Sequence, residues 1–371
     1  MNFTISSSAL ASVLQSTIKI IASKNTIPIL DCFLIEVHDS ILEVTASSES
    51  TAIHVTTPII CNDGDARFCV NAKQFVSAIK EIPEQPVIIE YTKDKSKIKG
   101  RHTSGKFSLM CQESDVYPRM KDIAEGSQFS ISATTLREGL SRCLFATSTD
   151  DLLSWKTCIC IDIKPDNVVF AATDGRKLVR DTHNSVKSEY ESQIKIPRNV
   201  AMLVSDAIKG DEVTITFDAE HAKLSTDDTV IYYRQTEGRF PNYNAVIPAT
   251  RTIRVNVDRG SMLSALKRVG VFCNKSSGLV KFKLGKNLIT LAGQDIDYAI
   301  SAEELMTCEY DGDEFSIGFG HQFLIEVMKG IGCETVTMEF VQPDKPCVCL
   351  PANPNGSDEL LMLLMPMNIE E

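Results

Sequence analysis

No stretch of this sequence is apolar enough for a membrane-spanning helix, which needs about 18–20 consecutive apolar residues. The first residues lack the basic segment and apolar core of a secretory signal peptide, so a cytoplasmic location is expected. Phosphate-binding P-loops, HExxH zinc motifs, GxSxG nucleophile motifs and dinucleotide-binding glycine fingerprints are also missing. These absences argue against a membrane protein, a secreted protein and the enzyme classes that the motifs define.

The twelve cysteines form no recognisable metal motif. Cys158 and Cys160, and likewise Cys347 and Cys349, alternate within apolar runs, so each pair should lie on one face of a strand. Neither pair has CxxC spacing or a nearby histidine, and both are predicted to be buried structural thiols. No metal or other cofactor is expected. Without an extracellular signature, the cysteines indicate a reducing cytosol.

The sequence does contain three near-copies of one unit, each a strand followed by an amphipathic helix. In each copy the apolar residues first alternate and then recur at helical spacing. The copies start at Phe3, Phe129 and Ile253, about 125 residues apart. A weaker strand–helix copy lies inside each unit and leads to a further strand at 87–91, 213–217 or 336–340. This repetition predicts an α+β fold of three similar domains, each with two strand–helix halves, at 1–124, 125–248 and 249–371.

The distribution of charge is uneven. The net charge is −11, which by itself argues against a nucleic-acid partner. The segments predicted as helices nevertheless carry more basic than acidic residues; they are 8–22, 72–81, 133–147, 197–209, 258–272 and 320–330. A basic helical layer in an acidic chain is typical of a surface that binds phosphates. Ordinary solvated helix faces also carry lysine and arginine, so charge alone leaves both interpretations open.

Several shorter segments have a predicted conformation. Asp39-Ser40 separates two apolar strands and predicts a hairpin. Residues 93–106 are polar and basic and predict a turn region, followed by a short strand at 107–109. The segments 115–126 and 238–248 contain proline and are predicted to be linkers.

Asp174-Gly175 lies between two strand-like runs and predicts a tight turn. A catalytic role for Asp174 would need a partner, but the motif contains no second carboxylate or histidine, so the turn is the favoured interpretation. The last residues, 360–371, begin as an apolar strand and end with acidic residues. Met365, Pro366 and Met367 are predicted to form a soft, adaptable surface there.

Five short motifs resemble those of the bacterial sliding clamps, the β subunits of DNA polymerase III. They are found at 26–30 (TIPIL), 106–109 (KFSL), 172–178 (ATDGRKL), 238–243 (GRFPNY) and 365–367 (MPM). Each motif is weak alone, but their order and spacing, together with the three-fold repeat, extend the resemblance over the whole chain.

The resemblance implies a head-to-tail homodimeric ring of six similar domains, with helices lining the hole and sheets forming the rim. Such a ring is not catalytic; it holds DNA polymerase on duplex DNA through weak contacts that do not depend on sequence. Lys24 matches a DNA contact of the family. With it, the basic residues expected to face DNA are Lys73, Arg137, Arg142, Arg198, Lys209, Lys267 and Arg268.

The resemblance also implies one pocket per subunit for a short partner motif that carries a Gln and bulky apolar residues such as Leu and Phe. Its expected walls are Trp155, Thr173, Gly175, Arg176, Leu178, Pro241, Val246, Leu363, Met365, Pro366 and Met367. DNA polymerase, the clamp loader and repair proteins would bind there. Ala245 and Asn368 replace basic residues frequent in the family, and Glu370 and Glu371 add acid, which leaves the partner preference open.

By the same resemblance, Lys106, Phe107 and Leu109 of one subunit would meet the third domain of its partner. The residues expected on that opposite side are Val271, Phe272, Glu303 and Glu304. Two alternatives stay open at this point. One is an enzyme of the same repeat architecture that uses Asp174 or the cysteines, and the other is a regulator that grips DNA without encircling it.

Overall fold

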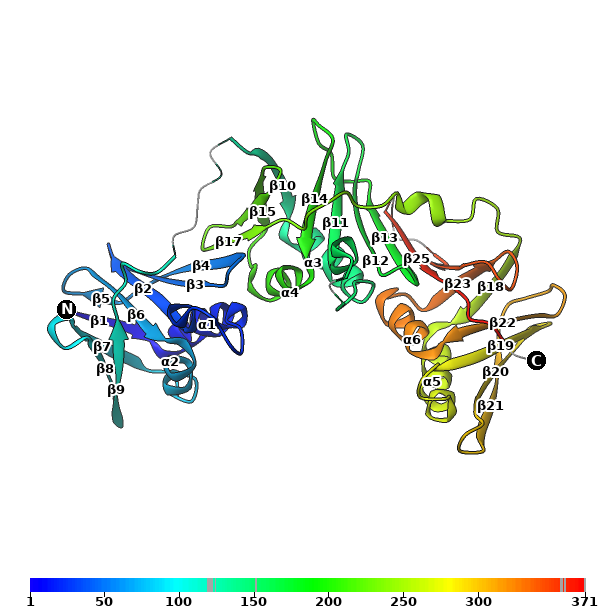
Figure 1. Cartoon of the computed structure of the whole chain (residues 1–371), viewed down its shortest axis with the longest axis horizontal. Helices are drawn as coiled ribbons and strands as arrows, with labels where there is room; N and C mark the ends of the chain where they lie inside the picture. The colour runs from blue at the N-terminus through cyan, green and yellow to red at the C-terminus, as the bar shows by residue number, and fades with distance from the viewer. Residues whose placement is uncertain (119–122, 124, 151, 354–355, 357, 370–371) are drawn as a thin grey trace. The chain divides into compact units, whose positions relative to one another are not determined.

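The computed structural model of the chain describes residues 1–118, 123, 125–150, 152–353, 356 and 358–369 (Figure 1). Within these ranges the chain combines six α-helices with antiparallel strands, which confirms the predicted α+β class. The helices are α1 (Ser7–Thr17), α2 (Ala72–Ile79), α3 (Ala133–Leu144), α4 (Arg198–Ala207), α5 (Arg259–Val269) and α6 (His321–Gly330). None of them is long and apolar enough to cross a membrane.

The strands belong to two units, one made of Met1–Arg137 with Asn199–Gln235, the other of Glu138–Arg198 with Thr236–Glu371. The first unit has one 13-stranded sheet in the order β10-β15-β16-β17-β4-β3-β2-β6-β9-β8-β7-β1-β5. Its strands are β1 (Asn2–Ser6), β2 (Cys32–His38), β3 (Ile41–Ser47), β4 (Thr51–Pro58), β5 (Cys61–Asn62), β6 (Ala66–Asn71), β7 (Pro86–Thr92), β8 (Lys97–His102), β9 (Gly105–Gln112), β10 (Ser127–Ser132), β15 (Glu212–Phe217), β16 (His221–Ser225) and β17 (Thr229–Arg234).

The second unit has an 8-stranded sheet, β14-β11-β12-β13-β25-β24-β23-β18, and a 4-stranded sheet, β21-β20-β19-β22. The first of these contains β11 (Cys158–Ile163), β12 (Val168–Thr173), β13 (Lys177–His183), β14 (Ser192–Pro197), β18 (Ile253–Asp258), β23 (Thr335–Phe340), β24 (Cys347–Pro351) and β25 (Glu359–Leu364). The other contains β19 (Leu279–Gly285), β20 (Leu288–Asp295), β21 (Ile300–Thr307) and β22 (Phe315–Gly320). In Figure 1, α5 and α6 lie side by side in this unit, as do α1 and α2 in the first.

The predicted repeat is visible in the strand–helix junctions. β1, β10 and β18 each run directly into a helix, and so do the inner strands β6, β14 and β22. Each opening strand pairs antiparallel with the further strand that follows the inner helix of the same repeat, β1 with β7, β10 with β15 and β18 with β23. A side chain caps each of these three helix starts: Ser6 accepts from the Ala9 amide at 3.3 Å, and Ser132 and Asp258 cap α3 and α5 in the same way.

The sheets run across the predicted domain limits. β17 pairs with β4, and β13 pairs with β25, so strands of the predicted second domain extend sheets of both neighbours. Both pairings join residues far apart in the sequence, and local periodicity carries no information about them. The limits at 124 and 248 stay a prediction.

The local predictions have mixed outcomes. Asp39 and Ser40 form the hairpin turn between β2 and β3, both with positive φ, as expected. The prediction of a turn region at 93–106 was wrong in part, because Lys97–His102 is the strand β8, paired with both β7 and β9. Its buried residues are Ile98 and Gly100, and because a glycine has no apolar side chain and lysines flank Ile98, the alternating pattern is not visible in the sequence.

Both predicted linkers are anchored by a buried tyrosine. In 115–126, the Tyr117 hydroxyl donates to the carbonyls of Cys32 and Thr45 at 3.3 and 3.4 Å, while 119–122 and 124 lie outside the described residues. In 238–248, the Tyr243 hydroxyl donates to Asp162 at 2.7 Å. Burial, with Asp162 beside it, raises the pKa of Tyr243, so the hydroxyl stays protonated and keeps donating. These aromatic anchors fix the start of one linker and the middle of the other to the adjacent sheets.

Candidate functional sites

The exit of the first helix and the start of α2 bring two predicted DNA contacts close together. Lys24 and Lys73 are both exposed. The Lys73 ammonium donates to the Ser23 carbonyl at 3.4 Å, directly beside Lys24 in the chain. Within the described residues neither lysine pairs with a carboxylate, so both charges are available to an anion.

Two lysines lie between α1 and the end of α4, and a carboxylate neutralises one of them. Lys209 is exposed and approaches the Ser12 hydroxyl at 3.4 Å. Lys19 on the first 3₁₀ turn after α1 (Ile18–Ile20) is paired with Asp206 at 2.7 Å. Of these two lysines, only Lys209 contributes positive charge that no carboxylate in the described chain cancels.

Three of the predicted DNA-binding arginines already have partners in their own unit. Arg142 donates to Asp181 at 2.9 Å and to Glu138 at 3.2 Å. Arg198 donates to the Leu144 carbonyl at the end of α3 and to the Thr147 hydroxyl. Arg268 forms a two-pronged pair with Glu304, with both N···O distances 2.5 Å. A phosphate contact by any of these arginines would have to compete with those partners.

The remaining two predicted contacts differ in exposure. Arg137 is partly buried and its Nε donates to the Ala133 carbonyl one turn back at 3.2 Å. Lys267 on α5 is exposed and has no carboxylate partner among the described residues. Lys267 therefore joins Lys24, Lys73 and Lys209 as a predicted contact without a carboxylate partner among the described residues. Lys329 on α6 is exposed and unpaired there in the same way, and it was not among the predicted contacts.

Asp181, which holds Arg142, belongs to a buried ionic network. His183 lies 3.2 Å from Asp181 and 3.4 Å from Asp358, the residue before β25. Burial alone would lower the pKa of His183, but the hydrogen bond and charge of Asp181 outweigh it and raise that pKa. Burial alone would raise the pKa of the Asp181 carboxyl, but His183 and Arg142 outweigh it and hold that pKa below its usual range. The network therefore ties α3, β13 and the start of β25 together.

Three predicted pocket residues meet in one apolar cluster of the second unit. Leu178 on β13 and Leu363 on β25 are buried in it, and Trp155, in the 3₁₀ turn Ser154–Thr157, packs partly buried against it. The cluster also contains Phe240 and Tyr243 from the predicted linker. The chain thus brings residues from four separate segments into one buried apolar cluster, and the partly buried side chains of Trp155, Ile247 and Leu350 form the apolar surface over it.

The turn between β12 and β13 borders this surface. The Thr173 hydroxyl accepts from the Gly175 amide at 3.1 Å and donates to the Lys177 carbonyl at 2.7 Å. Asp174 accepts from the amides of Arg176 and Lys177 at 2.9 and 3.0 Å, and Gly175 has a φ of +90°. The predicted tight turn is confirmed, and one carboxylate oxygen of Asp174 is occupied by backbone amides.

The C-terminal segment is hydrogen-bonded to this turn. The Met365 amide donates to the Arg176 carbonyl at 2.8 Å, immediately after β25 ends. The Met365 side chain is 42% exposed and that of Val246, in the 3₁₀ turn Tyr243–Val246, is 55% exposed. Pro241 and Pro366 are partly buried. Exposed apolar side chains beside a buried apolar cluster are typical of a docking surface.

Lys177 is a residue near this surface that the sequence prediction did not single out. It is only 6% exposed, and its ammonium lies 2.9 Å from Glu326 of α6 and 4.8 Å from the centre of the Phe323 ring. A buried ion pair with an aromatic contact fixes β13 to α6. Its neighbour Arg176 is exposed. Nothing in the local sequence shows which of the two basic residues is buried in an ion pair and which faces solvent.

The residues predicted for the subunit joint lie on two open strand edges. β9 pairs with β8 from Gly105 to Met110 and with β6 only at Cys111 and Gln112, so around Phe107 and Leu109 it has a partner on one side among the described strands. β21, which carries Glu303 and Glu304, lies at the edge of the 4-stranded sheet. Open edges are available for strand addition.

Some side chains near these edges are exposed, and others are partly covered by their own chain. Val271 and Phe272, in the 3₁₀ turn Gly270–Phe272, are 73% and 36% exposed. The Phe107 ring lies over Gly100, where a Cβ would come within 2.0 Å of it, so part of that ring is covered. Met110 on β9 and Leu305 on β21 are 65% and 63% exposed, and the sequence prediction did not include them.

Three family models match the chain in consecutive order. They are the N-terminal, central and C-terminal domains of the DNA polymerase III beta subunit, matching residues 1–121, 130–242 and 244–368. This chain belongs to the DNA polymerase III beta subunit family. The resemblance inferred from the five short motifs is confirmed.

Relatives of this family member cover its full length. The "Beta sliding clamp" of Chlamydia pneumoniae is 24% identical over 378 residues, and that of Pseudomonas aeruginosa is 23% identical over 376, with 100% of each chain covered. The solved beta subunit from Thermotoga maritima has a TM-score of 0.92 at 24% identity, covering 100% of both chains. A Pseudomonas aeruginosa sliding clamp bound to griselimycin has a TM-score of 0.91 at 22% identity, again covering 100% of both chains.

The family is non-catalytic, and the alternative of an enzyme that uses Asp174 or the cysteines is set aside. Cys158 and Cys160 are fully buried, and burial raises the pKa of Cys158 to about 11. Cys347 and Cys349 have their sulfur atoms 3.8 Å apart in the core. Among the described residues, no three His, Cys, Asp or Glu side chains are placed to hold a metal ion.

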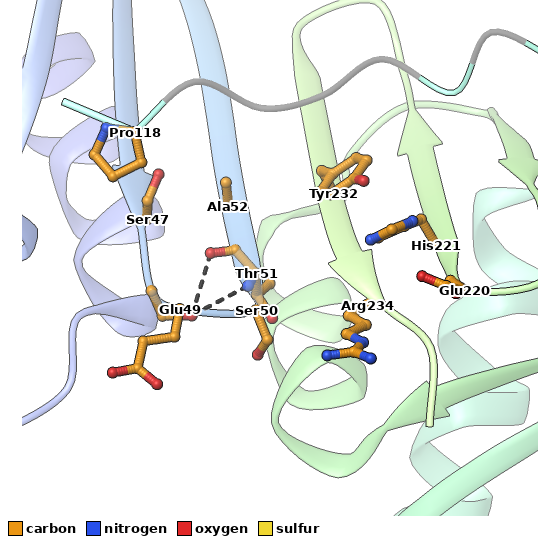
Figure 2. A pocket seen from close by; sticks show the side chains of 11 residues that line it. Ser47, Glu49, Ser50, Thr51, Ala52, Pro118, Glu220, His221, Tyr232 and Arg234 are labelled. Carbon is orange, nitrogen blue, oxygen red and sulfur yellow. Dashed lines mark hydrogen bonds between the residues drawn. The ribbon is translucent and has the colours of Figure 1, made fainter. Parts of the chain in front are cut away.

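The first unit of this beta subunit also contains a polar cleft that no prediction covered (Figure 2). It has a volume of about 450 Å³ and is lined by the β3–β4 turn together with Glu220, His221, Tyr232 and Arg234. The rings of His221 and Tyr232 stack with their centres 5.4 Å apart. The lining mixes both charge signs, and none of the residues predicted for DNA, partner peptide or joint belongs to it.

Proposed function

We propose that this chain is a DNA sliding clamp that closes head to tail with a second copy into a ring around duplex DNA and tethers the replicative polymerase. One observation carries the proposal: three repeated strand–helix units, matched in order to the three domains of a single non-catalytic clamp family. A ring holds DNA by topology, so it needs only weak phosphate contacts. The few free basic side chains on the helices suit that requirement.

The finer partner assignments belong to the same proposal. DNA polymerase, the clamp loader and repair proteins would bind through a short peptide motif at the apolar surface around Trp155, Leu178 and Leu363. Val246 and Met365 would supply exposed apolar contacts, since both side chains are accessible in the free chain. A surface that offers apolar side chains and backbone hydrogen-bonding groups is expected to bind short peptides with moderate affinity.

Retention on circular DNA tests the ring directly. The chain, assembled on nicked circular duplex by its clamp loader, should stay bound through gel filtration at moderate salt and leave once a restriction enzyme linearises the circle. A protein that grips DNA without encircling it would behave alike on both forms. Equal retention before and after cutting would therefore support the non-encircling regulator and reject the clamp.

The second test addresses the basic face. Replacing Lys24, Lys73 and Lys267 together by Glu should weaken DNA association and flatten its salt dependence, because each lost phosphate contact reduces the slope by about one. All three side chains are exposed, so the fold should be retained. Binding to short duplexes measured between low and moderate salt would show the change.

A matched control separates the helical face from net charge. Lys187, Lys286 and Lys345 are exposed and lie outside the helices, and the triple Glu variant of these residues changes net charge equally. It should bind DNA much as the unaltered chain does at moderate salt. Equal loss in both triple variants would show that overall charge, and not the helical layer, controls binding.

A further inference from the structure

The C-terminal segment separates the apolar docking surface from a second recess. Beyond Met365 the chain crosses to β22, where the Met367 amide donates to the Gly318 carbonyl at 2.8 Å. β22 lies at the edge of its sheet, so this contact adds the segment to an open edge. A Cβ on Gly318 would come within 2.8 Å of the Met367 carbonyl and 3.0 Å of the Ile369 side chain, so the segment rests directly on the strand.

The recess on this side is a cleft of about 450 Å³. Its lining comes from β19, β22, the β23–β24 turn and the C-terminal segment, and consists of Lys281, Ser316, Pro343, Asp344, Met367, Asn368 and Ile369. The cleft shares the C-terminal segment with the apolar docking surface. Met367 is both a predicted docking residue and a lining residue of the cleft, so a partner peptide that reaches Met367 lies at the cleft.

The charges of the cleft favour an acidic ligand group. Asp344 is already paired with Lys345 at 3.1 Å. Lys283, the neighbour of Lys281 along β19, is paired with Glu314 at 3.2 Å and does not line the cleft. Among the described residues, Lys281 has no such partner, so its charge is the one left uncompensated in the lining.

We propose that this cleft extends the docking site and receives an acidic side chain flanking the partner's core motif, with Lys281 as the counter-charge. Pro343 and Ile369 provide apolar contact for the neighbouring residue of that flank. The inference rests on the proposed peptide-docking function and adds a specificity element to it. Partners with acidic flanks would then be favoured over partners with neutral ones.

Fluorescence anisotropy with paired peptides tests this extension. All peptides carry one Gln/Leu/Phe core motif, flanked on the N- or the C-terminal side by Asp-Glu or, for comparison, by Asn-Gln. With the acidic flank on one of the two sides, the unaltered chain should bind the peptide about twofold to fivefold more tightly than the neutral counterpart. This is the gain expected for a partly exposed ion pair. Lys281→Glu should remove or invert this preference without altering affinity for the neutral peptides.

Lys283→Glu is the matched control, because it reverses a charge on the same strand outside the cleft. It should leave the acidic preference unchanged. Equal binding of acidic and neutral flanks by the unaltered chain would overturn the extension while the docking surface stands. An acidic preference that survives Lys281→Glu would overturn it too. Failure of every peptide to bind the unaltered chain would remove the docking function and the extension together.

Discussion

Replacing Val271 and Phe272 together by Ala is expected to convert the dimeric ring into monomers. Both truncations remove apolar contact across each joint. Val271 is 73% exposed in the single chain and Phe272 is 36% exposed. Truncating Val271 removes little packing within one subunit, whereas truncating Phe272 also removes some, so the thermal stability of the variant subunit is compared with that of the unaltered chain. Sedimentation velocity at micromolar concentration should show the monomer.

The expected shift is large because a head-to-tail ring has two identical joints. Losing the two apolar side chains costs roughly 3–5 kcal/mol per joint. Dissociation breaks both joints, so the total of roughly 6–10 kcal/mol raises the dimer dissociation constant by about 10⁴- to 10⁷-fold. A shift of that size is measurable even for a tight dimer.

Ile60→Ala with Val116→Ala is a suitable control. These side chains are 62% and 65% exposed and lie outside the predicted joint, so the dimer should persist. An unshifted dimer in the Val271/Phe272 variant would place the interface elsewhere.

The structure distinguishes between the two acidic residues expected at the joint. Glu304 is held by Arg268 in its own chain, and that hydrogen-bonded pair keeps the pKa of Glu304 low. Glu303 is exposed and has no basic partner among the described residues. Of the two acids expected on the opposite side of the joint, Glu303 is therefore the better candidate to pair with Lys106.

The local sequence pattern was sufficient to predict the repeated strand–helix unit, but it was insufficient to predict how the strands pair into sheets. A change from alternating to helical spacing is visible at each junction, and Ser6, Ser132 and Asp258 mark the helix starts by their capping chemistry. The pairings of β17 with β4 and of β13 with β25 depend on long-range packing that no short window records. Strand β8 was missed because charged residues alternate with its single buried isoleucine.

The candidate sites show a similar division. Basic residues can be counted on predicted helices, but a sequence does not distinguish a free lysine such as Lys267 from an arginine already paired, such as Arg142 or Arg198. The convergence of Trp155, Leu178 and Leu363 followed from the family resemblance, since three distant apolar residues carry no signal of contact by themselves. Their meeting in one cluster supports the proposed docking site.

Deleting 365–371 is expected to abolish binding of a Gln/Leu/Phe motif peptide while the dimer persists. The deletion removes the exposed Met365 side chain and the hydrogen bond from its amide to Arg176. It leaves β25 intact, because the pairing of that strand with β13 and β24 ends at Leu364. Fluorescence anisotropy would measure the peptide affinity, and sedimentation velocity would check the dimer.

The size of the expected loss follows from the apolar contacts. Burying two large peptide side chains yields about 4–6 kcal/mol before ordering costs. With backbone hydrogen bonds the total approaches −8 kcal/mol, which corresponds to about micromolar affinity. Losing half of the apolar contribution would already weaken binding about 30- to 150-fold, beyond the useful range of the assay.

Two further variants keep the docking prediction falsifiable. Glu370→Ala with Glu371→Ala should bind as the unaltered chain does, because the sequence predicts that the two acids are solvated; both lie outside the described residues. Val246→Ala with Met365→Ala should weaken binding without shortening the chain, since both side chains are about half exposed and contribute little to the core. Wild-type affinity in the full deletion would mean that the C-terminal segment is structural and that partner peptides bind at another surface.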